Sequence, residues 1–349
     1  MFELDKIIRA NIGRLKPYSS ARDEFSGTAS VYLDANENPY GSPLSQNYHR
    51  YPDPHQLALK KKISTIKGLP EQNIFLGNGS DEAIDILYRI FCNPGVDNAI
   101  ICPPTYGMYE VSADINDIAI GRVSLLPSFD LDVDRILSSV DEQTKLLFIC
   151  SPNNPTGNSM HKDDIEFLIT KFNGIVVIDE AYINYSRQSS CIQFLTEYPN
   201  VVILQTFSKA WGLAGIRLGM AFASAGIIDL MDKVKPPYNI SENTQQLALQ
   251  ALDNIEIVNT RIRETVQQRN KLAVDLDTLS IVQKVYPSDA NFLLVQVNDA
   301  PATYAYLVSK GVIVRDRSRL QLCENCLRIT VGTPAENKDL IDHLKTYIA

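Results

Sequence analysis

The chain has 349 residues, of which 45% are hydrophobic and 21% are charged, and its formal net charge is −8 at pH 7. This composition is typical of a globular protein with room for a large and a smaller domain, and it argues against a nucleic-acid partner because no basic run is dense enough to follow a phosphate backbone. No apolar run approaches the roughly 20 residues of a membrane span, and the charged N-terminus lacks the apolar region of a signal peptide, so we expect a cytoplasmic protein without a membrane partner.

The first forty residues follow no regular pattern of apolar positions. They contain "LKPYSSARDEF" and "LDANENPYGSP", and the turn-forming residues in both stretches favour irregular structure. We interpret residues 1–40 as an extended N-terminal arm. The run "LKKKI" at residues 59–63 is typical of the solvated face of a helix.

From residue 41 to residue 254, apolar runs of strand length alternate with amphipathic segments of helix length. Several runs are apolar throughout, as in strands that are buried on both faces. The alternation predicts an α/β fold in which helices flank a mostly parallel sheet. The predicted strands are Asn73–Leu76, Ala99–Cys102, Leu146–Cys150, Ile175–Ile178, Val201–Gln205 and Leu218–Ala223, and the helices include Asp81–Phe91, Asp163–Phe172 and Glu242–Asp253.

The pattern changes near residue 254, which predicts a second, smaller α/β domain at residues 255–349. Its predicted elements are a long helix at Ile255–Leu279, a strand at Phe292–Val297, a helix at Ala302–Lys310, strands at Val312–Arg315 and Leu327–Val331, and a last helix at Glu336–Ile348.

The six cysteines do not form a recognisable metal site. Cys323 and Cys326 have the spacing of a metal-binding pair, but there is no second pair and none of the four histidines is spaced to complete a site. Most of the cysteines lie in apolar runs, so we expect reduced thiols in the core and no bound metal.

Distinctive polar residues follow each predicted strand of the large domain. Because ligands of open parallel sheets bind beyond the carboxyl ends of the strands, these residues predict a site at one edge of the sheet. In chain order the segments are "GNGSDEA" after Leu76, "PPTYG" after Cys102, "SPNNPTG" after Cys150, "DEAY" after Ile178 and "TFSKAWGLAGIR" after Gln205.

The "GNGSDEA" segment is a candidate anion site. Its glycines allow a tight turn from strand to helix, and Ser80 or Asp81 can cap the helix that follows. Free amide groups at that N-terminus would bind a phosphate. The alternative is an ordinary turn with a capped helix.

Asp179 and Lys209 are the candidate reacting groups. A carboxylate at the end of a buried strand is costly unless it meets a cation or a proton donor, and a protonated pyridine ring would supply one; a structural cap is the alternative. A lysine held beside an aldehyde by such contacts can form a Schiff base. Further candidates around the same ring and phosphate are Tyr182, Asn154, Ser208 and Arg217.

Together these motifs resemble the fold-type I, pyridoxal-phosphate-dependent aminotransferases over nearly the full length of the chain. The resemblance rests on "SPNNPTG", "IDEAY", "TFSKAWGLAGIRLG" and "LRITVGT". Within that class, "LKPY", "LDANENPYG", "RYPDP", "GNGSDE" and "GVIVRD" look most like the histidinol-phosphate aminotransferase family. The resemblance implies a large domain with a mostly parallel seven-stranded sheet, a small C-terminal domain that packs with the N-terminal arm, and a homodimer with shared sites.

The resemblance also implies the role of each site residue. Lys209 forms the Schiff base with pyridoxal 5′-phosphate and then acts as general base, and Asp179 keeps the ring nitrogen protonated. Tyr182 and Asn154 hydrogen-bond the ring oxygen, and Tyr106 stacks on the ring. The phosphate contacts are Gly79, Ser80, Asp81, Ser208 and Arg217, with Thr206 as a weaker candidate and Tyr51 supplied by the other subunit.

For the substrates, the resemblance implies Arg328 as the group that binds the substrate anion, with Arg315, Tyr18 and Asn36 nearby. The implied reaction transfers an amino group between glutamate/2-oxoglutarate and imidazole-acetol phosphate/histidinol phosphate in L-histidine biosynthesis. The alternatives are an aromatic-amino-acid aminotransferase, a threonine-phosphate decarboxylase and, outside enzymes, a regulatory module that binds the cofactor without catalysis.

Overall fold

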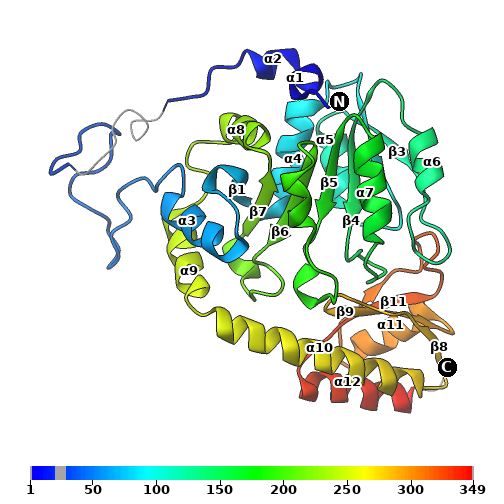
Figure 1. The fold of residues 1–349 in the computed structure, drawn as a ribbon. Coiled ribbons are helices and arrows are strands. Elements are labelled where there is room, and N and C mark those ends of the chain that lie inside the picture. Colours follow the sequence, from blue (N-terminus) through cyan, green and yellow to red (C-terminus); the bar gives the residue numbers. More distant parts are fainter. Residues whose placement is uncertain (1, 20–28, 348–349) are drawn as a thin grey trace.

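The computed structural model describes residues 2–19 and 29–347, and it contains two β-sheets (Figure 1). The first sheet has seven strands in the order β1-β7-β6-β5-β4-β2-β3. All pairs in it are parallel except those of β7, which runs antiparallel to both β1 and β6. The prediction of a mostly parallel α/β fold is therefore confirmed.

The strands of the first sheet are β1 (Ile74–Asn78), β2 (Asn98–Ile101), β3 (Ala119–Arg122), β4 (Thr144–Cys150), β5 (Ile175–Asp179), β6 (Val201–Thr206) and β7 (Leu218–Ala223). The helices that precede or connect them are α1 (Leu4–Ile7), α2 (Ala10–Gly13), α3 (Leu57–Lys67), α4 (Gly79–Phe91), α5 (Met108–Ile115), α6 (Val133–Ser138), α7 (Lys162–Lys171), α8 (Ala225–Val234) and α9 (Glu242–Leu252). Short 3₁₀ turns lie at Glu71–Asn73, Ile183–Tyr185, Cys191–Thr196 and Ala214–Ile216.

Helices cover both faces of this sheet, as the continuously apolar strands require. On one face, side chains of α4, α5 and α8 pack with alternate strand residues such as Phe148 and Val177. On the other face, side chains of α3, α6, α7 and α9 pack with the intervening residues, such as Leu147 and Val176. The sheet is thereby buried between two apolar layers, and its carboxyl edge stays accessible for a site.

The second sheet is antiparallel, with the order β10-β11-β9-β8. The long helix α10 (Ile255–Asp277) leads from the first lobe to this sheet (Figure 1). The sheet packs on α10, α11 and α12. The remaining elements are β8 (Val282–Val285), β9 (Phe292–Val297), α11 (Ala300–Ser309), β10 (Arg315–Asp316), β11 (Cys326–Thr330) and α12 (Pro334–Thr346).

Three strand predictions need correction. The edge strands β3 ("AIGR") and β8 ("VQKV") were not predicted, because both are half-exposed and lack a continuous apolar run. The predicted strand Val312–Arg315 is wrong in extent, since β10 contains only Arg315 and Asp316. The domain boundaries at residues 40 and 254 stay a prediction.

The start of the chain packs differently from the predicted extended arm. Residues 4–13 form two one-turn helices, and Ile12 is buried in the apolar layer that α4 and α8 share. The amide of Arg9 donates to the carbonyl of Ile90 on α4 at 3.0 Å. The apolar side chains of residues 2–13 therefore pack on the large lobe, and the packing of the whole arm with the C-terminal domain stays a prediction. Residues 1 and 20–28 of the predicted arm, and Ile348 of the predicted last helix, lie outside the described residues.

Two further expectations can be compared with the structure. Lys60 of "LKKKI" is only 6% exposed and forms an ion pair with Asp232 on α8 at 3.1 Å, so the run is not a wholly solvated helix face. All six cysteines are free thiols and buried, as predicted.

Within residues 2–19 and 29–347, no helix combines the length and the apolar character that a membrane crossing requires.

Candidate active site

A cavity of about 140 Å³ lies at the carboxyl edge of the first sheet. The ends of β4, β5 and β6, the beginning of α4 and the beginning of β7 surround it, because β7 runs opposite to its neighbours. Eleven of the twelve predicted cofactor residues line it. The complete lining is Gly79, Ser80, Asp81, Tyr106, Cys150, Asn154, Asp179, Ala181, Tyr182, Thr206, Ser208, Lys209, Ala214 and Arg217.

Asp179, the last residue of β5, is 2% exposed. Its Oδ2 accepts a hydrogen bond from the Tyr109 hydroxyl at 2.8 Å, and its Oδ1 accepts one from the amide of Ala181 at 3.0 Å. Among the described residues, no cationic side chain lies within ion-pair distance of it. Burial raises the pKa of Asp179 to about 6, although the two hydrogen bonds act in the opposite direction. A cation or a further proton donor in the cavity would stabilise the ionised form of this buried carboxylate.

The beginning of α4 forms one end of the cavity and is the candidate anion site. Gly79 has φ +73°, and Gly219 on β7 is packed so closely that a Cβ there would meet the Gly79 carbonyl carbon and the Ser80 nitrogen at 2.2 Å. This close approach fixes the first turn of a 13-residue helix against the sheet. The free amides and the positive end of the helix dipole at such a turn bind an anion.

Arg217 lies beside the same helix turn. Its Nη2 is 3.4 Å from Oδ2 of Asp81, and Oδ1 of Asp81 accepts a hydrogen bond from the Tyr106 hydroxyl at 3.0 Å. The predicted capping of α4 by Ser80 or Asp81 is wrong: α4 begins at Gly79, so both residues lie inside its first turn, and no side chain caps the helix. Asp81 instead holds Arg217 and Tyr106 at the two sides of the cavity.

Lys209 projects into the cavity from the loop between β6 and β7. Its Nζ lies 5.5 Å from the centre of the Tyr182 ring. Burial lowers the pKa of Lys209, and the positive charge of Arg328 lowers it further. Burial also raises the pKa of the Tyr182 hydroxyl. Relative to a free lysine, the site thus shifts Lys209 toward the neutral amine, a potential nucleophile or base, and it keeps the Tyr182 phenol as a potential hydrogen-bond donor.

Arg328 on β11 links the second sheet to the cavity. Its Nη1 donates to Oδ1 of Asn154 at 2.6 Å, and its guanidinium lies 5.4 Å from the centre of the Phe292 ring. Arg315 pairs directly with Arg328 in the β10–β11 ladder and is exposed. Of the four predicted substrate residues, Arg328 therefore contacts a predicted cofactor residue directly, and Arg315 is its neighbour in the ladder.

Three predicted residues lie away from the Lys209 cavity in the single chain. Tyr51 and Asn36 line another hollow, and the ring of Tyr51 stacks on Tyr238 at 4.5 Å between ring centres. Tyr18 is 74% exposed and borders a third hollow near α8. A single copy of the chain does not bring these three to the cavity.

The sequence analysis missed several residues of the site. Tyr109 donates the hydrogen bond to Asp179 but is fully buried on α5, so in the sequence it looks like an ordinary core aromatic. Cys150 and Ala181 also line the cavity, and Ala214 lines it beside the small residues of the Lys209 loop. Cys150 ends a buried apolar strand and Ala181 is an alanine beside Tyr182, so no chemical signal distinguished these two.

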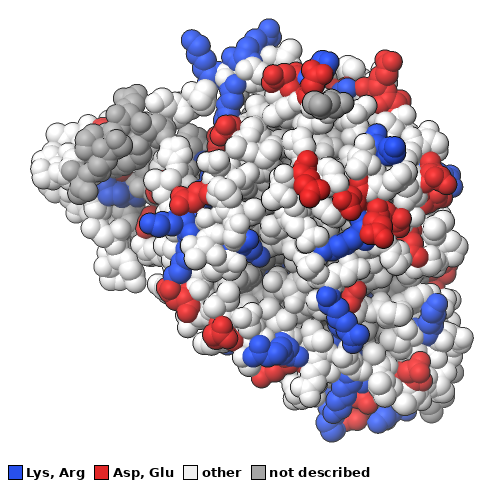
Figure 2. Space-filling model, viewed as in Figure 1, with Lys and Arg blue, Asp and Glu red and all other residues white. Residues whose placement is uncertain are grey.

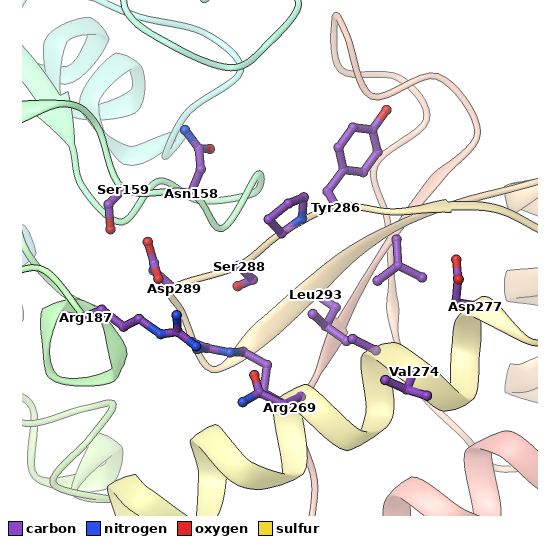
Figure 3. A pocket seen from close by; sticks show the side chains of 14 residues that line it. Asn158, Ser159, Arg187, Arg269, Val274, Asp277, Tyr286, Ser288, Asp289 and Leu293 are labelled. Carbon is purple, nitrogen blue, oxygen red and sulfur yellow. The ribbon is translucent and has the colours of Figure 1, made fainter.

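A second cavity, of about 580 Å³, lies between the first lobe and α10 (Figure 3). Arg187, Arg269 and Asp289 converge in it (Figure 3). Arg269 is 4% exposed, and its Nη1 donates to the carbonyl of Ala290 at 2.9 Å. None of the predicted site residues lines this cavity, and Arg269 uses its Nη1 to join α10 to the carbonyls of Tyr185 and Ala290.

Comparisons with known proteins agree with the fold and identify the family. The family described as "Aminotransferase class I and II" matches residues 28–344. A histidinol-phosphate aminotransferase of Cytophaga hutchinsonii is 54% identical over 346 residues, 99% of each chain. One of Parabacteroides distasonis is 51% identical over 345 residues, again 99% of each chain.

Among solved structures, the histidinol-phosphate aminotransferase of Sinorhizobium meliloti in complex with pyridoxal-5′-phosphate has a TM-score of 0.78 at 22% identity. The match covers 89% of each chain. At this identity the likeness establishes a shared fold, which agrees with the two-sheet arrangement described above.

Proposed function

Because the chain belongs to the class I and II aminotransferase family, and within it to the histidinol-phosphate aminotransferases, we propose that it transfers an amino group between glutamate and imidazole-acetol phosphate. The products are 2-oxoglutarate and histidinol phosphate, so the reaction belongs to L-histidine biosynthesis. The observation that carries the proposal is the convergence of a lysine amine, a buried carboxylate and a helix N-terminus in one cavity, in a chain with relatives above 50% identity. Those relatives do not favour an aromatic-amino-acid aminotransferase, a threonine-phosphate decarboxylase or a non-catalytic module.

The cavity fits pyridoxal 5′-phosphate as the cofactor. When bound, this group supplies an aldehyde that an amine can attack and a protonated ring that withdraws electrons from the substrate. A protonated ring nitrogen would satisfy the Asp179 carboxylate, which otherwise stays buried without a cationic contact. At the other end, the amides of the first α4 turn, Ser208 and Arg217 would hold the phosphate.

Lys209 is the residue we propose as covalent anchor and general base. Its pKa is lowered, which favours the neutral amine relative to a free lysine, and both roles require the neutral form. As base it would take the proton from the substrate Cα and deliver it to C4′ of the cofactor. Tyr182 and Asn154 would donate hydrogen bonds to the ring oxygen, and Tyr106 would cover one face of the ring, with Thr206 next to the phosphate.

Arg328 is the proposed anchor of the substrate anion, and Arg315 the second cationic group. Arg328 already donates to Asn154, so substrate and cofactor contacts would be mechanically linked. Glutamate offers a second carboxylate and histidinol phosphate offers a phosphate, and two guanidinium groups can bind either anion by donating hydrogen bonds to it. Tyr18 and Asn36 stay predicted pocket residues.

We further propose that the active form is a homodimer, in which Tyr51 reaches the phosphate of the other subunit. Residues 29–51 project from the large lobe (Figure 1) and are largely uncharged at the surface in Figure 2. Exposed apolar patches of this kind mark protein interfaces. The exposed apolar side chains are Val31 (66%), Leu33 (88%), Tyr40 (96%), Leu44 (63%), Tyr48 (41%) and Tyr51 (51%). Light scattering that gives the monomer mass at micromolar concentration would refute this part of the proposal. The cytoplasmic location stays a prediction.

The reaction itself is tested by titrating the purified holoenzyme with histidinol phosphate and following the visible absorbance of the bound cofactor. We expect the band to disappear in near-stoichiometric proportion, and 2-oxoglutarate to restore it. Phenylalanine and threonine phosphate serve as competitors. A faster response to phenylalanine, or release of carbon dioxide from threonine phosphate, would contradict the assignment.

A further inference from the structure

Three arginines share one face of the second sheet. Arg315 pairs with Arg328 in the β10–β11 ladder. The amide of Arg317 donates to the carbonyl of Cys326 at 2.8 Å, which continues this ladder by one residue beyond the end of β10. Because side chains alternate between the two faces of a strand, the side chains of Arg315, Arg317 and Arg328 lie on the same side.

That side faces the first sheet and its cavity. The neighbouring residues on it, Cys326 and Leu294, belong to the apolar layer that includes the first sheet. Leu327 and Ile329, which alternate with them along β11, pack instead against the helices of the C-terminal lobe. Arg328 itself reaches Asn154 in the cavity wall. The three guanidinium groups are thus gathered on the substrate side of the site.

Their positive charge is only partly compensated, by the carboxylate of Asp316 beside Arg317. Among residues 2–19 and 29–347, none of the three forms an ion pair within 4.0 Å. The Nε atoms of Arg317 and Arg328 are buried and have no hydrogen-bond partner. Burial and the other arginines lower the pKa of Arg317. Gathering like charges and leaving buried donors unpaired is costly, unless a ligand with several negative oxygens occupies the space between them.

We propose that Arg317 is a third arginine of the substrate site, and that it makes the site prefer a phosphate monoester to a carboxylate. This inference rests on the proposed function and extends it, since neither the sequence resemblance nor the comparisons assign a role to Arg317. A carboxylate has two oxygens and one charge, and two guanidinium groups satisfy it. A phosphate monoester has three free oxygens and about 1.5 to 2 charges at neutral pH, so it can engage a third.

The test compares Arg317→Gln with the wild-type holoenzyme on three compounds: histidinol phosphate, histidinol without the phosphate, and glutamate. A hydrogen bond to a charged group corresponds to roughly a 10-fold to 100-fold effect on binding. We expect kcat/KM for histidinol phosphate to fall at least about 10-fold, with histidinol and glutamate changed by less than about 3-fold. Arg319→Gln is the matched control, because Arg319 is exposed and its replacement alters the net charge equally.

Two further measurements separate a binding role from a structural one. Calorimetric titration of each holoenzyme with inorganic phosphate should show weaker binding to Arg317→Gln and unchanged binding to Arg319→Gln. Arg317→Lys, which keeps the charge, should recover part of the preference for histidinol phosphate. Equal losses toward all three compounds, or phosphate binding that both glutamine variants share with the wild type, would overturn the inference. If the wild type itself fails to turn over histidinol phosphate, the proposed function fails, while the phosphate titration still decides the role of Arg317.

Discussion

Replacing Asp179 by asparagine should stabilise the cofactor-free protein while it weakens cofactor binding. In the folded chain the pKa of Asp179 is raised from 3.8 to about 6, chiefly by burial. Because the folded state holds the proton more tightly than the unfolded chain, the cofactor-free protein loses stability as the pH rises from about 4 through about 6, and the loss is complete above that window. At about 1.4 kcal/mol for each pH unit of difference, the penalty at neutral pH is about 3 kcal/mol.

Asparagine removes the buried charge and can keep both contacts, with its oxygen facing the Ala181 amide and its amide group facing Tyr109. We therefore expect cofactor-free Asp179→Asn to be more stable than the cofactor-free wild type by up to about 3 kcal/mol near pH 7.5. The difference should shrink toward zero near pH 4. The same variant should bind pyridoxal 5′-phosphate more weakly, because the ring nitrogen loses its negative partner.

The assay is urea unfolding of both cofactor-free proteins at a series of pH values. One protein concentration is used throughout, since association changes apparent stability. Asp114→Asn serves as control, because Asp114 is exposed on α5 and its replacement should leave the difference near zero at every pH. A variant that is less stable than the wild type near pH 7.5, or a difference that does not vary with pH, would refute the reasoning.

Two other substitutions test contacts around the same cavity. Tyr109→Phe removes the hydrogen bond to Asp179 and leaves a buried carboxylate oxygen unpaired. Urea unfolding of the cofactor-free protein should therefore show a loss of about 1–3 kcal/mol in the free energy of unfolding. In an Asp179→Asn background the loss should be smaller, and an equal loss there would contradict the coupling between Tyr109 and the Asp179 charge. Gly219→Ala places a methyl group 2.2 Å from the Gly79 carbonyl carbon, so it should cost about 1–3 kcal/mol and raise the Kd for pyridoxal 5′-phosphate. Gly215→Ala, which meets nothing within 4 Å, is its control, and equal behaviour of the two alanine variants would count against a role for the close approach.

The sequence was informative about the site wherever residues follow buried strands. Apolar runs fixed the positions of β4, β5 and β6 to within one or two residues, and parallel strands end at a common edge. The sequence alone therefore assigns Asp179, Asn154 and Lys209 to one edge of the sheet, and all three line one cavity there. Two chemical features then indicated the reacting groups. One is a carboxylate at the end of a buried strand, and the other is a lysine among small residues.

The sequence was less informative where position depends on packing between distant segments. Tyr109 looks like an ordinary core aromatic until its hydroxyl is seen against Asp179. Arg317 lies in a polar connection without periodicity, and only the continuation of the β10–β11 ladder assigns it to the face of Arg328. Tyr51 does not reach the cavity of its own chain, so its predicted role depends on a second copy. Edge strands such as β3 bury too little surface to leave an apolar run in the sequence.

The reversed direction of β7 has a consequence for evolution of the loop that carries Lys209. Residues 207–217 leave the end of β6 and return along the neighbouring strand, and the carbonyl of Leu218 accepts the amide of Phe207 at 3.0 Å. The two ends of the loop are thus held next to each other by this hydrogen bond. Phe207 lies two residues before Lys209, and Leu218 directly follows Arg217. An insertion there would push the amine and the guanidinium out of alignment together. Unlike the surface connections elsewhere in the chain, this loop should keep a constant length in any functional descendant.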